Sequence, residues 1–109
     1  MKGYLKGYQV EIIRLIAAKY DCSYDEALVV LLQALKNEKI RVEIKQILQH
    51  IDKKDAIPKK VYLNESYKAL RKLAKANGKS VAYIIDLVIK AVEYNPKIFY
   101  DNVKYLSVL

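Results

Sequence analysis

Residues 59–92 constrain the fold of this 109-residue chain more than any other part of it. They begin with a short stretch in which the apolar residues Val61 and Leu63 alternate with Lys60 and Tyr62. An apolar residue at every second position predicts a strand with one buried face.

Two helices are predicted after this strand. Asn64 is a favourable N-cap, and Asn77-Gly78 ends the first helix, because glycine readily takes the left-handed conformation. Ser80 caps a second helix, which is apolar on nearly all sides and should therefore be buried on more than one face. The apolar positions are Tyr67, Leu70, Leu73 and Ala74 in the first helix, and Ile84, Ile85, Leu87, Val88, Ala91 and Val92 in the second.

A weaker copy of the helical pattern lies 57 residues earlier. Asp21 stands where Gly78 stands, and Ser23 stands where Ser80 stands. Ser23 and Glu26 form an S-x-x-E capping box, which favours a helix start. The matching apolar positions are Ile13, Ile16, Ala17, Ala27, Leu28, Leu31 and Leu32.

The strand of this copy has less support. Tyr4 and Leu5 match Tyr62 and Leu63 at an offset of 58, so one residue is gained between strand and helix. Two glycines flank the stretch, and glycine weakens a strand.

The rest of the chain connects and follows these two units. The spacing of Ile40, Ile44, Ile47, Leu48 and Ile51 predicts a helix over about residues 38–53, although alternation at its start leaves a strand open there. The predicted organisation is one compact domain with units at 1–36 and 58–95, a mostly helical connector at 37–57 and a tail at 96–109. The tail is aromatic and β-branched, and its structure is left open between helix and strand.

The net charge of +8 points to nucleic acid or an acidic membrane surface as a partner. Residues 58–109 hold ten Lys and Arg against four Asp and Glu, so the basic character lies in the second half. No apolar run reaches the roughly 18 residues that span a bilayer, and no signal-peptide pattern is present. With Cys22 as the one cysteine, a cytoplasmic location is expected, and we expect nucleic acid and not a membrane as the partner.

Catalytic patterns are lacking. His50 is the one histidine and has no partner at a metal-ligand spacing, and there is no glycine-rich phosphate loop or Ser/His/Asp set. We therefore expect no enzyme activity, no metal or cofactor and no small-molecule ligand. Cys22 precedes a helix N-terminus, which would lower the pKa of its thiol, and a redox role is a further hypothesis.

The order of motifs in residues 59–92 resembles the ribbon-helix-helix family of DNA-binding regulators. The matching features are a strand ending in Leu63, a polar cap, L-x-x-L-A at residues 70–74, Gly78-Lys79-Ser80 at the turn, and paired apolar positions in the second helix. The earlier copy resembles the family more weakly. The spacing from Leu63 to Leu70 is seven residues where the family has eight, which puts the face assignment of this strand in question.

The resemblance implies a mainly α fold with a short antiparallel β-ribbon. Two units in tandem would form a pseudo-dimer within one chain, with a connecting helix between them. The family's ribbon enters the major groove of DNA.

The same resemblance assigns the DNA-contacting residues. Lys60 and Tyr62 would contact bases from the ribbon; the alternative is an edge strand protected by a lysine and a half-buried tyrosine. The predicted phosphate contacts are Lys59, Lys79, Ser80 and Ser23, although both serines would cap helices in any case. Lys68, Arg71, Lys72 and Lys75 would steer DNA or form a solvated face.

The leading hypothesis is a sequence-specific regulator of transcription that binds double-stranded DNA and self-associates, with the direction of regulation left open. Because the two ribbon strands differ, its DNA site would have imperfect two-fold symmetry. One alternative is an antitoxin-like protein-interaction module that grips a partner through Ile98, Phe99, Tyr100 and Tyr105. Another is a helical assembly protein that binds nucleic acid without sequence preference.

Overall fold

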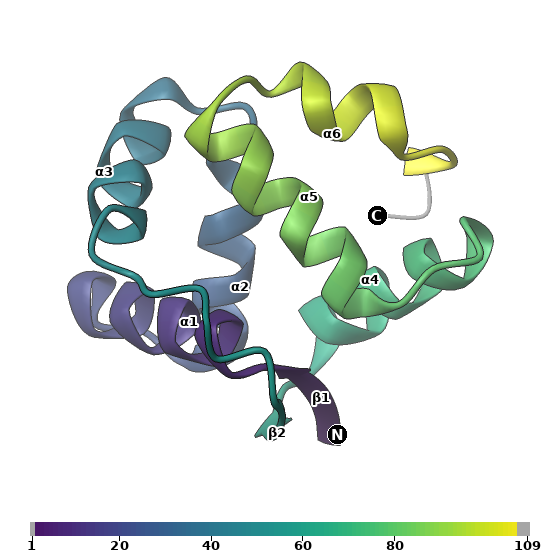
Figure 1. Cartoon of the computed structure of the whole chain (residues 1–109), viewed down its shortest axis with the longest axis horizontal. Coiled ribbons are helices and arrows are strands. Elements are labelled where there is room, and N and C mark those ends of the chain that lie inside the picture. Colours follow the sequence, from purple (N-terminus) through teal and green to yellow (C-terminus); the bar gives the residue numbers. More distant parts are fainter. Residues whose placement is uncertain (1, 107–109) are drawn as a thin grey trace.

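The computed structural model describes residues 2–106, which form six helices and a two-stranded antiparallel sheet (Figure 1). The predicted mainly α fold with a short antiparallel ribbon is confirmed. The elements in order are β1 (Lys2–Lys6), α1 (Gly7–Tyr20), α2 (Tyr24–Gln33), α3 (Glu38–Leu48), β2 (Pro58–Tyr62), α4 (Glu65–Ala76), α5 (Val81–Glu93) and α6 (Lys97–Asn102). We call β1, α1 and α2 the N-terminal unit, and β2, α4 and α5 the C-terminal unit.

The ribbon lies at one end of the molecule and joins segments that are far apart in the sequence (Figure 1). Gly3 lies opposite Val61, and both are buried against the helices. Leu63, just beyond β2, is buried as well. The short spacing after Leu63 has therefore not reversed the faces of β2.

The glycines of the N-terminal unit do not prevent its strand from forming, because β1 runs over five residues. A Cβ atom at Gly3 would overlap the ring of Tyr67 on α4, and one at Gly7 would overlap the carboxylate of Asp55. Both glycines therefore allow another segment to approach the backbone closely, and for Gly3 this is a common reason for glycine in a strand.

The two helix-turn-helix connections have similar backbone geometry. Asp21, which ends α1, has φ 50°, and Gly78, which follows α4, has φ 65°. Both residues take the left-handed conformation, which aspartate tolerates better than most side chains. Ser23 and Ser80 then cap α2 and α5 by accepting hydrogen bonds from backbone amides three residues on.

The extra residue of the N-terminal unit is accommodated within α1. Helices α1 and α4 both start two residues after the buried leucine of their strand. Buried Ile13 and Ile16 nevertheless match buried Leu70 and Leu73 at an offset of 57. Ile12 is buried too, so α1 places two adjacent isoleucines in the core.

Helix α5 lies at the centre of the fold, in contact with α3, α4, α6 and β1 (Figure 1). Its eight buried residues cover more than half of its circumference, so it is buried on more than one side as predicted, whereas Tyr83 and Lys90 on the remaining side are exposed. Such a helix is stable only where neighbours cover several of its faces.

The connector helix is shorter than predicted. Helix α3 begins at Glu38 but ends at Leu48, and the alternative of a strand at its start is wrong. Residues 49–57 turn back over the start of α1. There the amide of Gly7 donates to the Ile57 carbonyl at 3.0 Å, and that of Tyr8 to the Asp55 carbonyl at 2.9 Å. The loop thus satisfies amides of a first helical turn that have no partner within α1.

The C-terminal tail packs on the core as helix α6, and its last three residues lie outside the described part of the chain. Phe99 is 1% exposed and Val103 is 4% exposed. The Asn77 side chain holds the segment beyond α6, donating to the Lys104 carbonyl at 2.9 Å and accepting from the Lys104 amide at 2.8 Å. Across residues 2–106, no helix combines the length and the apolar character that a bilayer crossing requires.

Candidate nucleic-acid interface

The outward face of the ribbon carries two lysines and two tyrosines. Lys60 and Tyr62, the predicted base contacts, point away from the core, and Tyr62 is 67% exposed. Lys2 and Tyr4 share this face with them, and Tyr4 is 60% exposed. The sequence pattern matched Tyr4 to Tyr62 but predicted neither Lys2 nor Tyr4 as a base contact, although K-x-Y-L occurs in both strands, at residues 2–5 and 60–63.

The register arranges these four side chains about a local two-fold axis. Lys2 lies opposite Tyr62, and Tyr4 lies opposite Lys60. The pair between them, Gly3 and Val61, is therefore the centre of the arrangement. Directly opposite residues of an antiparallel pair project from the same face, so the two strands offer the same groups in opposite directions. The two strands match on their outward face and differ at the central buried pair, Gly3 and Val61.

Gln9 and Ser66 relate the two units in the same way. They are the buried polar residues of the described chain, and they stand 57 positions apart. Gln9 Nε2 donates to the Ala82 carbonyl at 2.9 Å, and Ser66 Oγ lies 3.1 Å from the Asp25 carbonyl oxygen, with its one proton shared between that oxygen and the Asp25 carboxylate. Residues 25 and 82 are also 57 positions apart, so the same contact between units occurs twice.

The start of α4 is capped by a residue of the other unit. Asn64 occupies the predicted N-cap position, but its side chain makes no capping bond. Instead, Asp25 Oδ1 on α2 accepts from the Asn64 amide at 2.7 Å and from Ser66 Oγ at 2.5 Å. Burial opposes ionisation of Asp25, but the hydrogen bonds from Ser66 and Asn64 prevail and lower the pKa of its carboxyl.

A second carboxylate, Asp86 on α5, holds the junction of β1 and α1. Asp86 accepts from Lys6 Nζ at 2.7 Å, from Gln9 Nε2 at 2.9 Å and from the Tyr8 hydroxyl. Burial first, and then the hydrogen bond to Asp86, raise the pKa of the Tyr8 hydroxyl far above its ordinary value. Each unit therefore fixes the strand-to-helix junction of the other with an aspartate.

The starts of α5 and α2 differ as anion sites. Helix α5 has no acidic residue in its first turn, and Lys79 stands beside Ser80 with its Nζ 4.9 Å from the centre of the Tyr83 ring. Helix α2 has Asp25 and Glu26 in its first turn. Because the positive end of a helix dipole attracts anions and carboxylates repel them, the start of α5 suits a phosphate better.

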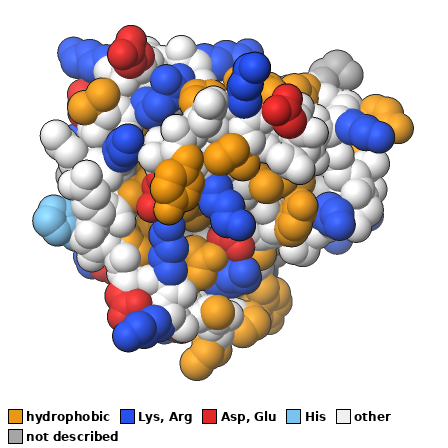
Figure 2. All heavy atoms as spheres, turned by 45° about the horizontal axis from the view of Figure 1, so that its top comes forward, with side chains coloured by type: hydrophobic (Ala, Val, Ile, Leu, Met, Phe, Trp, Pro, Cys, Tyr) orange, Lys and Arg blue, Asp and Glu red, His pale blue; other side chains and the backbone are white. Residues whose placement is uncertain are grey.

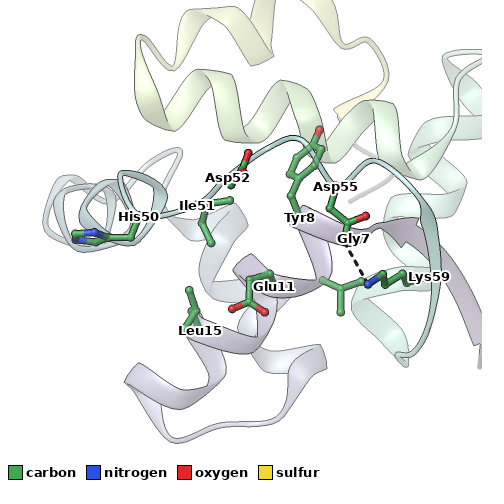
Figure 3. A pocket seen from close by; sticks show the side chains of 10 residues that line it. Gly7, Tyr8, Glu11, Leu15, His50, Ile51, Asp52, Asp55 and Lys59 are labelled. Atoms are coloured by element: carbon green, nitrogen blue, oxygen red, sulfur yellow. Dashed lines mark ion pairs between the residues drawn. The ribbon is translucent and has the colours of Figure 1, made fainter.

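Lys59 lies on the other face of the ribbon from Lys60. It stands opposite buried Leu5, and its Nζ is 3.2 Å from Asp55 Oδ2 (Figure 3). The two residues border an open pocket of about 380 Å³ beside α1, which Glu11 and His50 also line. This ion pair turns Lys59 towards the loop before β2 and away from the outward face.

The four basic residues of α4 are all exposed. Lys68 lies near Glu65, with Nζ 3.3 Å from Oε1, while Lys75 is in the last turn. A helix rises 1.5 Å per residue, so Lys75 stands roughly 10 Å farther along α4 than Lys68.

On the face in Figure 2, Lys and Arg side chains are spread among hydrophobic and acidic ones.

The described residues contain no group of three or more His, Cys, Asp and Glu side chains placed to hold a metal ion. The expectation for Cys22 is wrong in direction. Burial, together with the nearby Glu26 and Asp21 carboxylates, raises the pKa of its thiol. A raised pKa makes a thiol less reactive.

Comparisons of the chain with protein-family models, with curated proteins and with solved structures found no match. The candidate interface therefore depends on its own geometry. Its strongest features are the four side chains of the outward ribbon face and the start of α5 with Lys79.

Proposed function

We propose that the protein is a sequence-specific regulator of transcription that binds double-stranded DNA through its β-ribbon. The ribbon would enter the major groove, which admits a two-stranded β-ribbon. Lys2, Tyr4, Lys60 and Tyr62 would then face the base edges. The observation that carries this proposal is the register, which gives both strands the same outward Lys-x-Tyr pattern about the Gly3–Val61 pair.

The two units would form a ribbon-helix-helix pseudo-dimer within one chain. Three repeated relationships support this: the antiparallel pairing of β1 with β2, the left-handed residues Asp21 and Gly78, and the equivalent contacts of Gln9 and Ser66. A second chain is then not needed to complete the ribbon. The free protein should be a monomer in solution, and self-association would serve adjacent sites on DNA.

The DNA site would be an inverted repeat that is more symmetric than the sequence suggested. Lysine donates to the O6 and N7 acceptors of guanine in the major groove, and a tyrosine hydroxyl can bond a base or a phosphate. Since Lys2 and Lys60 are related by the local two-fold axis, each half-site should present an acceptor to one lysine.

The start of α5 would bind the DNA backbone. Lys79 and the amides at the start of this helix would hold one phosphate. Lys68 on α4 would add to the attraction, and this electrostatic part of the affinity should fall steeply as salt rises. Lys59 lies on the face of the ribbon opposite to Lys60, where it pairs with Asp55, so we assign it no direct role.

Selection from a random duplex library, followed by fluorescence anisotropy, tests the proposal. We expect a preferred inverted repeat, and a loss of about 1–3 kcal/mol of binding free energy on it for Lys60→Ala. Tyr62→Ala should also weaken binding to the preferred site. Lys45→Ala, which removes an exposed lysine of α3, is the matched control. A selection that yields no preferred sequence would reject sequence-specific binding and favour the assembly-protein alternative.

The antitoxin-like alternative lacks a supporting observation. Of the four residues assigned to a partner-binding tail, Phe99 projects from α6 into the core and Ile98 packs against the core. Tyr100 and Tyr105 are the exposed ones. The described tail thus uses its largest apolar side chain to complete its own fold.

A further inference from the structure

An apolar groove of about 500 Å³ lies between α2, α4 and α6. Its walls include Leu32, Phe99 and Leu106. Val29 and Tyr100 also line it and stay 40% and 36% exposed, so apolar surface faces solvent there. None of the residues that contribute to the outward ribbon face lines this groove.

The groove has one cation. Lys36 lines it and is exposed, and no ion pair to it occurs within residues 2–106. An anionic group at Lys36 would keep its apolar remainder within reach of Val29 and Tyr100. This combination of one positive charge with apolar walls fits an amphipathic anion.

The size of the groove favours a small ligand over a protein. Small-molecule sites usually measure about 300–1,000 Å³, whereas a stable protein interface takes about 20–30 residues from each side. Ten described residues line this groove. We propose that it binds a small amphipathic carboxylate, such as a medium-chain fatty acid or an aryl carboxylate. The sequence did not suggest such a site, because its walls come from three separate helices.

The groove borders the contact that caps α4. Ser66 lines the groove and donates to Asp25 Oδ1, which also accepts from the Asn64 amide. Asn64 follows Tyr62 by two residues. A ligand that moves Ser66 relative to α2 would therefore change how the end of β2 is held. This coupling rests on the proposed function, and by linkage DNA must change the affinity for the ligand by the same factor.

Ligand binding is tested first without DNA, on the full chain. Decanoate is titrated by calorimetry and by amide NMR, with decylammonium as the probe of opposite charge. We expect saturable one-site binding of decanoate, with shifts at groove residues, and at least fivefold weaker binding in Lys36→Ala. Val29→Asp should abolish it. Lys39→Ala and Val42→Asp, which alter exposed α3 residues outside the groove, should bind like the wild type.

Several results would overturn the proposal. Equal binding of decylammonium would remove the role of Lys36, and loss of binding in Val42→Asp would show an unspecific effect. Absence of saturable binding below the micelle concentration would reject the site. If light scattering shows a dimer that Val29→Asp dissociates, the groove is a contact between two copies of this chain. Circular dichroism melts establish that each variant is folded.

The coupling is tested by adding decanoate to the DNA titration. We expect the DNA affinity to change at least threefold in the wild type and to stay constant in Val29→Asp. Unchanged affinity at saturating decanoate would reject the coupling. If no duplex binds specifically, the proposed function fails, and calorimetry still decides the groove independently.

Discussion

The carboxylate of Asp25, on α2, accepts a hydrogen bond at 2.7 Å from the backbone amide of Asn64, 39 residues later in the chain. The first unit thereby caps the helix that follows the strand of the second unit. An aspartate at a helix start satisfies an amide that would otherwise be unpaired and also favours the helix dipole.

Asp25→Ala should lower the free energy of unfolding by about 1–2 kcal/mol, because a cap and a partner of Ser66 are both lost. Urea denaturation followed by circular dichroism measures this. Asp101→Ala, on the exposed side of α6, is the control and should have little effect. An equal loss of unfolding free energy in both variants would mean that the Asp25 contact does not stabilise the fold.

The Asp25 contact should also depend on pH. Its folded-state pKa lies below the ordinary value of 3.8, so the ionised form stabilises the fold. The contribution is fully present above about pH 5 and is lost as the pH falls through 3.8 towards the folded pKa. The stability difference between wild type and Asp25→Ala should therefore shrink below pH 4. A difference that stays constant down to pH 3 would contradict this.

Gly3→Ala should destabilise the protein by about 1–3 kcal/mol, since the new methyl group would overlap the Tyr67 ring. Tyr67→Leu should relieve the overlap, so the double variant should lose less than the sum of the single variants. Gly78→Ala is the control: space is open there, but φ is 65°. Its cost of about 1 kcal/mol should not change with Tyr67→Leu. Additive effects of Gly3→Ala and Tyr67→Leu would disprove the close contact.

Lys2 and Lys60 should each read one half of the DNA site. On a symmetric inverted repeat, Lys2→Ala and Lys60→Ala should weaken binding by similar factors, within about 1–3 kcal/mol. On duplexes in which one half-site is altered, the affinity of each variant should be unaffected when the alteration lies in the half that its missing lysine would contact. An alteration in the other half should still weaken binding. Anisotropy titrations with a fluorophore at a defined end identify the halves. If both variants respond to the same half, the two-fold arrangement does not govern recognition.

The starts of α5 and α2 predict a gain-of-function change. Cys22 stands 57 residues before Lys79 and so occupies the equivalent place before α2. Lys79→Ala should weaken DNA binding about equally for all sequences and reduce the salt slope by about one. Cys22→Lys should strengthen binding and increase the slope. Lys19→Ala, in the last turn of α1, serves as the control. A Cys22→Lys variant with unchanged salt dependence would reject this role for the α2 start.

The features that sequence predicted well depend on neighbouring residues. The serine caps and the left-handed turns at Asp21 and Gly78 are encoded within a few positions, and so are the starts of their helices. The features that sequence missed depend on distant partners. Gly3 seemed unfavourable for a strand because the local sequence does not show why a glycine is needed there. The reason is the ring of Tyr67, which packs against Gly3 from 64 positions away.

The sequence predicted too late an end for α3, again because a distant part of the chain determines it. Its apolar spacing continues to Ile51, yet the backbone of residues 55 and 57 is recruited to the first turn of α1. Lys2 and Tyr4 were in principle visible, because their strand repeats K-x-Y-L. Their outward direction followed only from the pairing of β1 with β2.

Both strands of the ribbon belong to the same chain, and this determines how the outward ribbon face responds to dilution. A ribbon made by two chains dissociates at low protein concentration, so the occupancy of its target rises only once the concentration is high enough for dimers to form. Here β1 and β2 stay together at any concentration. Under the proposed function, occupancy of the DNA site should rise in simple proportion to the first few molecules made, which suits a regulator that acts at low copy number.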